Sequence, residues 1–134
     1  MGVHGYDGER LELRARLEPN VNIHGVAFGG SIYSICALSG WGLLVLRLED
    51  QGLNPRLMIA GGEIKYVKPV DQAINAVSWL PDEGAFDEFV QTCKEKDKAR
   101  IKVPVYVELD DGSVAARFSG DFIALRRQRE KIAA

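Results

Sequence analysis

The amino-acid sequence predicts an α+β domain in which an antiparallel β-sheet wraps around one long hydrophobic helix. Three observations favour this fold class. Residues 26–46 contain no charged side chain over 21 consecutive positions, the segments on both sides alternate between apolar and polar residues, and only one further segment has helical periodicity. A chain of 134 residues is long enough to bury such a core as a single domain covering residues 1–134.

The first predicted element is a β-hairpin. Asp7-Gly8 lies between two strand-like segments, and this pair favours a two-residue turn because both turn positions need positive φ. In the second arm, residues 10–17, apolar residues alternate with charged ones, which is typical of a half-buried strand. The apolar positions of that arm are Leu11, Leu13, Ala15 and Leu17. Residues 19–25 are predicted as a loop because of their proline, asparagine and glycine content.

The uncharged run has two interpretations: a membrane span, or a helix buried on nearly every side. Eight of its 21 residues are glycine, serine or tyrosine, which is too polar a composition for an efficient bilayer span. No basic cluster flanks either end to set an orientation. We therefore expect a buried helix from about Ser31 to Leu48 and no membrane partner. A helix that is apolar all round must be enclosed by the rest of the chain.

Four strands and a second helix are expected after the central helix. The strands are predicted at residues 57–67, 73–80, 101–109 and 114–125, with a hairpin turn at 110–113. The second helix is predicted within residues 84–96, where four apolar residues recur at helical spacing with acids early and lysines late. These apolar residues are Phe86, Phe89, Val90 and Cys93.

Composition argues against several classes of protein. The net charge of −2 and a pI near 5.7 are unlike a nucleic-acid-binding domain, which usually carries a concentrated basic face. The two cysteines, Cys36 and Cys93, lie 57 positions apart with no Cys-x-x-Cys pair. We therefore expect no metal site, no cofactor, and the reduced thiols of a cytoplasmic protein. The N-terminus has no secretory signal pattern.

Four stretches of the chain resemble a known family. They are Pro19-Asn20-Val21-Asn22, Ala27-Phe28-Gly29-Gly30-Ser31-Ile32-Tyr33-Ser34, Ser39-Gly40-Trp41-Gly42 and Ile64-Lys65-Tyr66-Val67-Lys68-Pro69-Val70. Together with the order of the predicted elements, these stretches resemble the hotdog-fold thioesterase superfamily, and most closely the YiiD C-terminal type of putative thioesterase. The combination of Phe-Gly-Gly-Ser with Gly-Trp-Gly is the most specific part of the resemblance.

The resemblance implies a hotdog fold, in which the antiparallel sheet wraps the central helix. It also implies a homodimer, or a tetramer built from it, whose two sheets join edge to edge. The implied activity is hydrolysis of an acyl-CoA or acyl-carrier-protein (acyl-ACP) thioester at sites on the subunit interface.

A carbonyl-binding site is predicted at the start of the central helix. In hotdog enzymes, backbone N–H groups at this position form the equivalent of an oxyanion hole. Amides at a helix start carry partial positive charge, and glycine allows a thioester carbonyl to approach closely, so the candidates are Gly29, Gly30 and Ser31. The alternative is that the glycines only permit a tight turn from loop to helix.

The group that activates the nucleophile is left open by the sequence. Hotdog enzymes often place Asp or Glu on the central helix or just before it, but residues 25–46 contain neither. Asn22 could hold the attacking water or cap the loop. His24 could act as a general base or be structural. Glu63 could reach across the subunit interface as a base or be a solvated strand charge.

Four further residues are candidates for substrate binding. Phe28 precedes the glycine pair, and Ser34 lies on the first turns of the predicted helix. Ser31 and Ser34 are also candidates for orienting the nucleophile. Tyr66 could shape an acyl pocket or belong to the core. Lys68 could meet a CoA phosphate or be a surface cation.

Two other functions remain open at this point. A non-catalytic acyl-binding or dimerisation module would keep the fold while lacking the acid. A hydratase or dehydratase is less favoured: residues 19–24 weakly resemble the Asp-x-Asn-Pro-x-His loop of hotdog hydratases, but the leading Asp is missing and the spacing differs.

Overall fold

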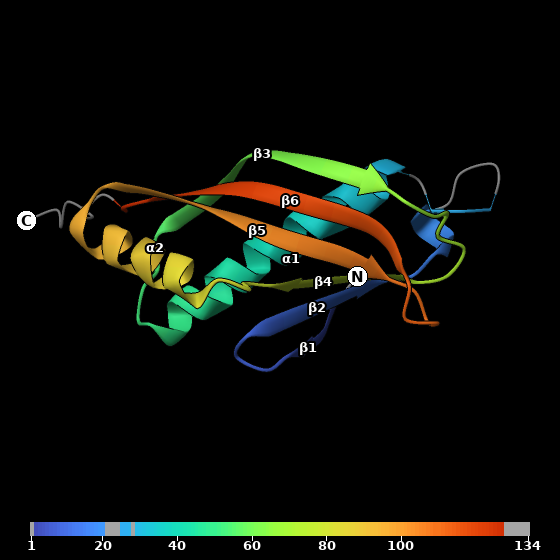
Figure 1. The fold of residues 1–134 in the computed structure, drawn as a ribbon, viewed down its shortest axis with the longest axis horizontal. Coiled ribbons are helices and arrows are strands. Elements are labelled where there is room, and N and C mark those ends of the chain that lie inside the picture. Colours follow the sequence, from blue (N-terminus) through green and yellow to red (C-terminus); the bar gives the residue numbers. More distant parts are fainter. Residues whose placement is uncertain (1, 21–24, 28, 128–134) are drawn as a thin grey trace, which may run out of the picture.

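The computed structural model describes residues 2–20, 25–27 and 29–127, which form one curved antiparallel sheet around a long helix (Figure 1). The strands are β1 (Gly2–Tyr6), β2 (Arg10–Ala15), β3 (Arg56–Tyr66), β4 (Ile74–Trp79), β5 (Lys98–Glu108) and β6 (Val114–Leu125). The helices are α1 (Gly29–Asp50) and α2 (Glu83–Glu95), with a short 3₁₀ turn at Glu18–Asn20. The strand order is β1-β2-β4-β5-β6-β3, with antiparallel neighbours throughout. This is the predicted hotdog arrangement.

The helix α1 is the centre of the core. Cys36, Leu43, Leu44 and Leu48 on α1 are fully buried, against apolar residues from β2, β4, β5 and β6. By length and composition α1 could cross a membrane; in this fold it is the core helix, and it runs behind β5 and β6 in Figure 1. It starts at Gly29, two residues before the predicted start, and the glycine pair therefore forms its first turn.

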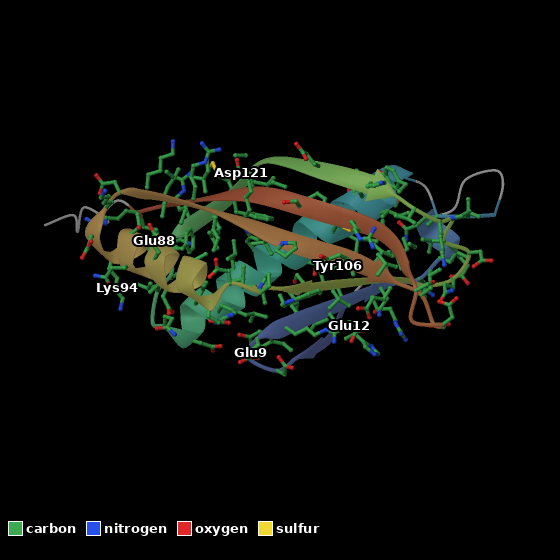
Figure 2. All side chains as sticks on the ribbon, viewed as in Figure 1. Glu9, Glu12, Glu88, Lys94, Tyr106 and Asp121 are labelled. Atoms are coloured by element: carbon green, nitrogen blue, oxygen red, sulfur yellow. The ribbon has the colours of Figure 1, made fainter. Side chains whose placement is uncertain are left out.

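The sheet has an inner face toward α1 and an outer face directed away from it. Because strand side chains alternate between faces, Phe118 and Phe122 of β6 pack inward, while Asp121 points outward. On the outer face Tyr106 stacks on Trp79 with 5.0 Å between ring centroids, and Arg100 donates to Asp121 at 2.6 Å. Figure 2 shows Tyr106 and Asp121 on this face. The outer face is therefore largely polar.

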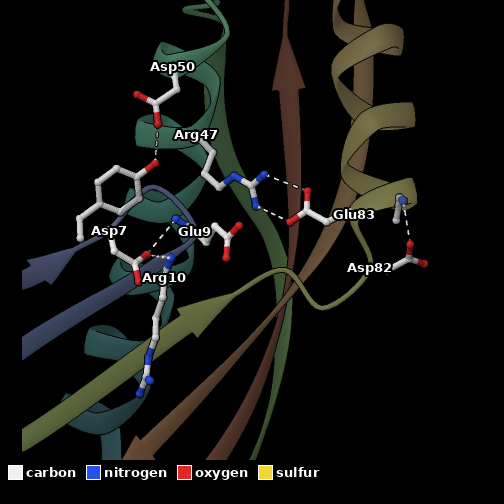
Figure 3. Close-up of polar contacts among 9 residues, drawn as sticks. Asp7, Glu9, Arg10, Arg47, Asp50, Asp82 and Glu83 are labelled. Atoms are coloured by element: carbon white, nitrogen blue, oxygen red, sulfur yellow. Dashed lines mark hydrogen bonds and ion pairs between the residues drawn. The ribbon is translucent and has the colours of Figure 1, made fainter.

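A cluster of polar contacts holds the end of α1 against the start of α2 (Figure 3). The Arg47 guanidinium donates two hydrogen bonds to the Glu83 carboxylate, at 3.1 and 3.0 Å, and lies 4.1 Å from the Phe86 ring centroid. Asp82 caps α2 by accepting from the Ala85 N–H at 3.0 Å. The hydrogen bonds from Arg47 lower the pKa of the Glu83 carboxyl below its ordinary value.

The lowered pKa of Glu83 predicts a pH dependence of stability. In the unfolded chain a Glu carboxyl has a pKa of about 4.3, and in the folded protein the pKa of Glu83 is lower. The contribution of Glu83 to stability is therefore fully present above the unfolded pKa and is lost as the pH falls through the folded pKa. We expect the difference in unfolding free energy between wild type and Glu83→Gln to be largest at pH 7 and to shrink below about pH 4. Urea denaturation at several pH values measures this. A difference that stays constant down to pH 3 would contradict the assignment.

Candidate active site

A pocket lies at the start of α1, between the helix and the segment that follows β3. Its volume is about 330 Å³, and it is lined by Ala27, Gly29 and Ile32 on one side and by Tyr66, Val67, Lys68, Pro69 and Val70 on the other. The two sides are joined by a backbone hydrogen bond from the Ala27 N–H to the Val70 carbonyl at 2.6 Å. The predicted helix start and the predicted Tyr66–Val70 motif therefore meet in one site.

The first turn of α1 has the chemistry of an anion site. The first N–H groups of any α-helix have no intrahelical acceptor, and the helix dipole gives them partial positive charge. Gly29 lines the pocket, Gly30 is exposed and Ser31 is half-buried. The first turn contains no acidic side chain. A developing oxyanion is the kind of ligand that this arrangement stabilises.

Tyr66 links the end of β3 to this first turn. Its hydroxyl donates to the Gly29 carbonyl at 2.7 Å. A Cβ added at Gly29 would lie 3.3 Å from the Tyr66 hydroxyl oxygen. Burial, with smaller contributions from Cys36 and Tyr33, raises the pKa of the Tyr66 hydroxyl, so the group stays protonated and donates. Its side chain is still 49% exposed and can contact a bound molecule. Tyr66 therefore positions the helix start as well as lining the pocket.

The other substrate-binding candidates lie around this site. Ser34 is exposed one turn beyond Gly30 and donates to the Gly30 carbonyl at 2.9 Å, so its oxygen can still accept a hydrogen bond. Lys68 is exposed at the rim, where its backbone N–H and that of Val67 both donate to the Ala115 carbonyl, at 3.0 and 2.7 Å. These two bonds fix the chain path that carries Lys68 past the helix start.

Glu63 is not brought to the helix start. In β3 it lies between Gly62, where a Cβ would meet Phe118 and Tyr33 on the inner face, and Ile64, which packs into the core. Glu63 pairs in register with Ser119 and points from the outer face. The sheet of this chain therefore separates Glu63 from Gly29.

Three of the predicted site residues, Asn22, His24 and Phe28, lie outside the described residues. Two described residues next to these positions make hydrogen bonds. Asn20 donates from its side chain to the Arg16 carbonyl at 2.8 Å, and Ala27 pairs with Val70.

Ser39 lies on the central helix, where hotdog enzymes often carry an acid, but it faces into the sheet. Its hydroxyl lies 3.0 Å from that of Ser78, which donates to the Ser39 carbonyl at 3.0 Å. Both side chains are fully buried. The pair satisfies its own polar groups inside the core, so Ser39 has a structural role. Among the described residues, no three His, Cys, Asp or Glu side chains gather as a metal site.

Sequence reasoning missed five residues of the pocket wall: Ala27, Ile32, Val67, Pro69 and Val70. The Ile64–Val70 motif already contained Pro69 and Val70, next to Lys68. The pairing of Ala27 with Val70 could not be predicted from the sequence, because a contact between residues 43 positions apart depends on how the sheet folds.

A curved antiparallel sheet around one long helix is the arrangement of the hotdog fold, the class to which thioesterases of this type belong. The family model described as putative thioesterase (yiiD_Cterm) matches residues 1–126. The chain belongs to this family, as its sequence resemblance predicts.

Solved structures agree with this assignment. A protein of unknown function from Chlorobaculum tepidum TLS is 30% identical with a TM-score of 0.88, covering 93% of this chain and 82% of that chain. A putative thioesterase from Shewanella oneidensis is 29% identical with a TM-score of 0.81, covering 92% and 82%. A probable thioesterase from Pseudomonas aeruginosa, 17% identical with a TM-score of 0.77 over 93% and 82%, supports the fold alone.

The link between Tyr66 and Gly29 predicts a measurable loss of stability. Tyr66→Phe removes the hydroxyl and leaves the ring, so we expect the unfolding free energy to fall by about 0.5–1.5 kcal/mol. Tyr106→Phe is the matched control, because the Tyr106 hydroxyl makes no hydrogen bond among the described residues. Equal effects of the two substitutions in chemical denaturation would show that the Tyr66 bond does not hold the helix start.

Proposed function

We propose that this protein hydrolyses acyl thioesters carried by CoA or by an acyl-carrier protein. The observation that carries the proposal is the pocket in which the glycine start of α1 faces Tyr66 and Lys68. Membership in a thioesterase family supports the reaction class. The substrate carbonyl oxygen would accept hydrogen bonds from backbone N–H groups of Gly29, Gly30 and Ser31.

The proposed reaction needs a polarised carbonyl and a positioned water. Water adds to the carbonyl carbon, and the negative charge that forms on oxygen is stabilised by the helix-start amides. The C–S bond then breaks, the thiolate leaves and takes up a proton, and the fatty acid departs. Asn22 would hold the water by hydrogen bonds, or His24 would take a proton from it and return that proton to the leaving thiolate. Lys68, at the rim, would contact a phosphate of the carrier.

We also propose a homodimer joined through β3. Among the described strands β3 pairs only with β6, so one edge of this 11-residue strand offers unpaired backbone groups to a second copy. Large apolar side chains are exposed along it, including Met58 and Ile59 at 41% and 40%. On the outer face, an antiparallel pairing with a second copy can set Arg56 beside Glu63 of the partner subunit. This charge complementarity gives Glu63 a role at the interface.

The proposed dimer makes a prediction about oligomeric state. Ile59→Lys places a charge at the β3 edge, and like charges from two copies would then meet. We expect the molar mass from light scattering to drop from dimer to monomer at micromolar concentration. Val3→Lys, the same kind of change on the opposite edge strand, should leave the dimer intact. A dimer that survives Ile59→Lys but not Val3→Lys would place the interface at β1.

A non-catalytic acyl-binding module is the second candidate function. The observation that favours it is the exposed side of α1, where Gly30, Ser34, Leu38 and Trp41 supply no carboxylate. Such a protein would bind acyl thioesters through the same helix start without cleaving them.

A hydrolysis assay separates the two functions. Release of free thiol from acyl-CoAs of graded length should be observed for the wild type. Gly30→Val should lower kcat/KM by at least about tenfold, because the added side chain obstructs the carbonyl site. Gly5→Val is the control, since a Cβ at Gly5 meets nothing within 4 Å.

Two further substitutions test the assignment of the water-binding group. Asn22→Ala should reduce kcat, whereas Glu63→Ala should leave kcat unchanged apart from any effect on dimerisation. Binding of acyl-CoA without turnover at any chain length would support the module instead. Turnover that is insensitive to Gly30→Val would leave hydrolysis standing and remove the helix start from the mechanism.

A further inference from the structure

We propose that the acyl chain of the substrate lies in a groove between β1 and the exposed side of α1, and that this groove selects long chains. The inference rests on the proposed thioester function, because it assigns the occupant as the acyl part of the same substrate. The groove has a volume of about 320 Å³ and is lined by apolar residues and glycine alone. Val3 and Leu13 line it from the hairpin, and Leu38, Trp41 and Val45 line it from α1.

The groove is open to solvent although its walls are apolar. Val3 is 66% exposed, Leu38 38% and Trp41 40%. A methylene chain is the ligand that such walls favour, since burying it removes apolar surface from water on both sides without leaving a polar group unpaired. Addition of a peptide strand at β1 is disfavoured, because β1 has only five residues and its register shifts between Val3 and Gly5.

One side of α1 connects the groove with the helix start. Gly30, Ser34, Leu38, Trp41 and Val45 follow one another at spacings of three or four residues, which places them on one side of a helix. None of them carries a charge. From Gly30 to Leu38 the helix advances about 12 Å, and to Trp41 about 16 Å. A chain whose carbonyl is held at Gly30 can therefore lie along this side of α1 and enter the groove.

The structure limits the groove at its side and at its far end. Trp41 donates from Nε1 to the Leu57 carbonyl of β3 at 3.1 Å, so the indole bridges α1 to β3 and forms a fixed wall. Beyond Val45, the Tyr6 hydroxyl donates to Asp50 at 2.7 Å and joins the end of β1 to the end of α1. Val45 lies about 22 Å beyond Gly30 along the helix, so a chain of roughly eighteen carbons would extend from the helix start to the far part of the groove and stop before this polar pair.

Binding of non-hydrolysable S-alkyl-CoA thioethers tests this inference without requiring turnover. The sequence has two tryptophans, Trp41 and Trp79, so a Trp79→Phe background makes Trp41 emission report on the groove. We expect Kd to tighten roughly fourfold for each added methylene that enters the groove. The tightening should begin at about ten carbons, where the chain reaches Leu38, and level off at about eighteen carbons. A Kd that does not depend on chain length would overturn the proposal.

A filling substitution locates the chain. Val45→Phe narrows the far part of the groove, so the levelling-off should move to shorter chains while the shortest ligands bind as before. Ile123→Phe is the matched control, because it makes the same kind of change at a half-buried apolar residue on the outer face. Leu38→Gln is a second variant, at the rim of the groove, and should weaken the binding of ligands with long chains. If Val45→Phe has no effect on chain length, or changes the oligomeric mass instead, the groove belongs to another occupant and the proposal fails.

The two proposals can fail separately. Graded binding without hydrolysis of acyl-CoA would reject the enzyme and keep the groove as an acyl site. Hydrolysis with the same kcat/KM for all chain lengths, together with flat binding, would keep the enzyme and reject the groove.

Discussion

The burial of α1 is the constraint on which the rest of the structure depends. A helix with apolar residues on every side cannot remain in water, and a single flat sheet would cover only one of its sides. The sheet therefore curls so that β2, β4, β5 and β6 all contact α1, and Gly40 permits close approach because a Cβ there would lie 2.9 Å from the Phe122 ring. Enclosure also fixes where the helix begins, and with it the position of the pocket.

The enclosure is incomplete on one side, and both proposed functions use that side. Gly30, Ser34, Leu38 and Trp41 remain reachable between the two edge strands of the sheet. The same helix thus presents polar backbone groups at its start and apolar side chains further along. This order matches an acyl thioester, which has one polar carbonyl followed by a hydrocarbon chain.

Local patterns predicted the elements well, and long-range pairing could not be predicted from them. A hairpin at Asp7-Gly8, the second helix and the strand at 114–125 are confirmed because turn chemistry and periodicity are local properties. The expected turn geometry is wrong, because Gly8 has positive φ and Asp7 does not. The position of β3 beside β6, rather than beside the next strand along the chain, depends on how the sheet closes around α1. That position, with the irregular register after Ile59, sets the outward direction of Glu63. The side of α1 that is exposed could not be predicted either, because apolar residues occur on every side of this helix.

The central claim is that the amides at the start of α1 bind the thioester carbonyl. Two-dimensional NMR of the ¹⁵N-labelled protein, titrated with a keto analogue of an acyl-CoA in which CH₂ replaces sulfur, tests it most directly. The account predicts saturable shifts that are largest for the amides of Gly29, Gly30 and Ser31, with those of Gly5 and Gly112 unmoved. Saturable binding that leaves the three helix-start amides unmoved would contradict it.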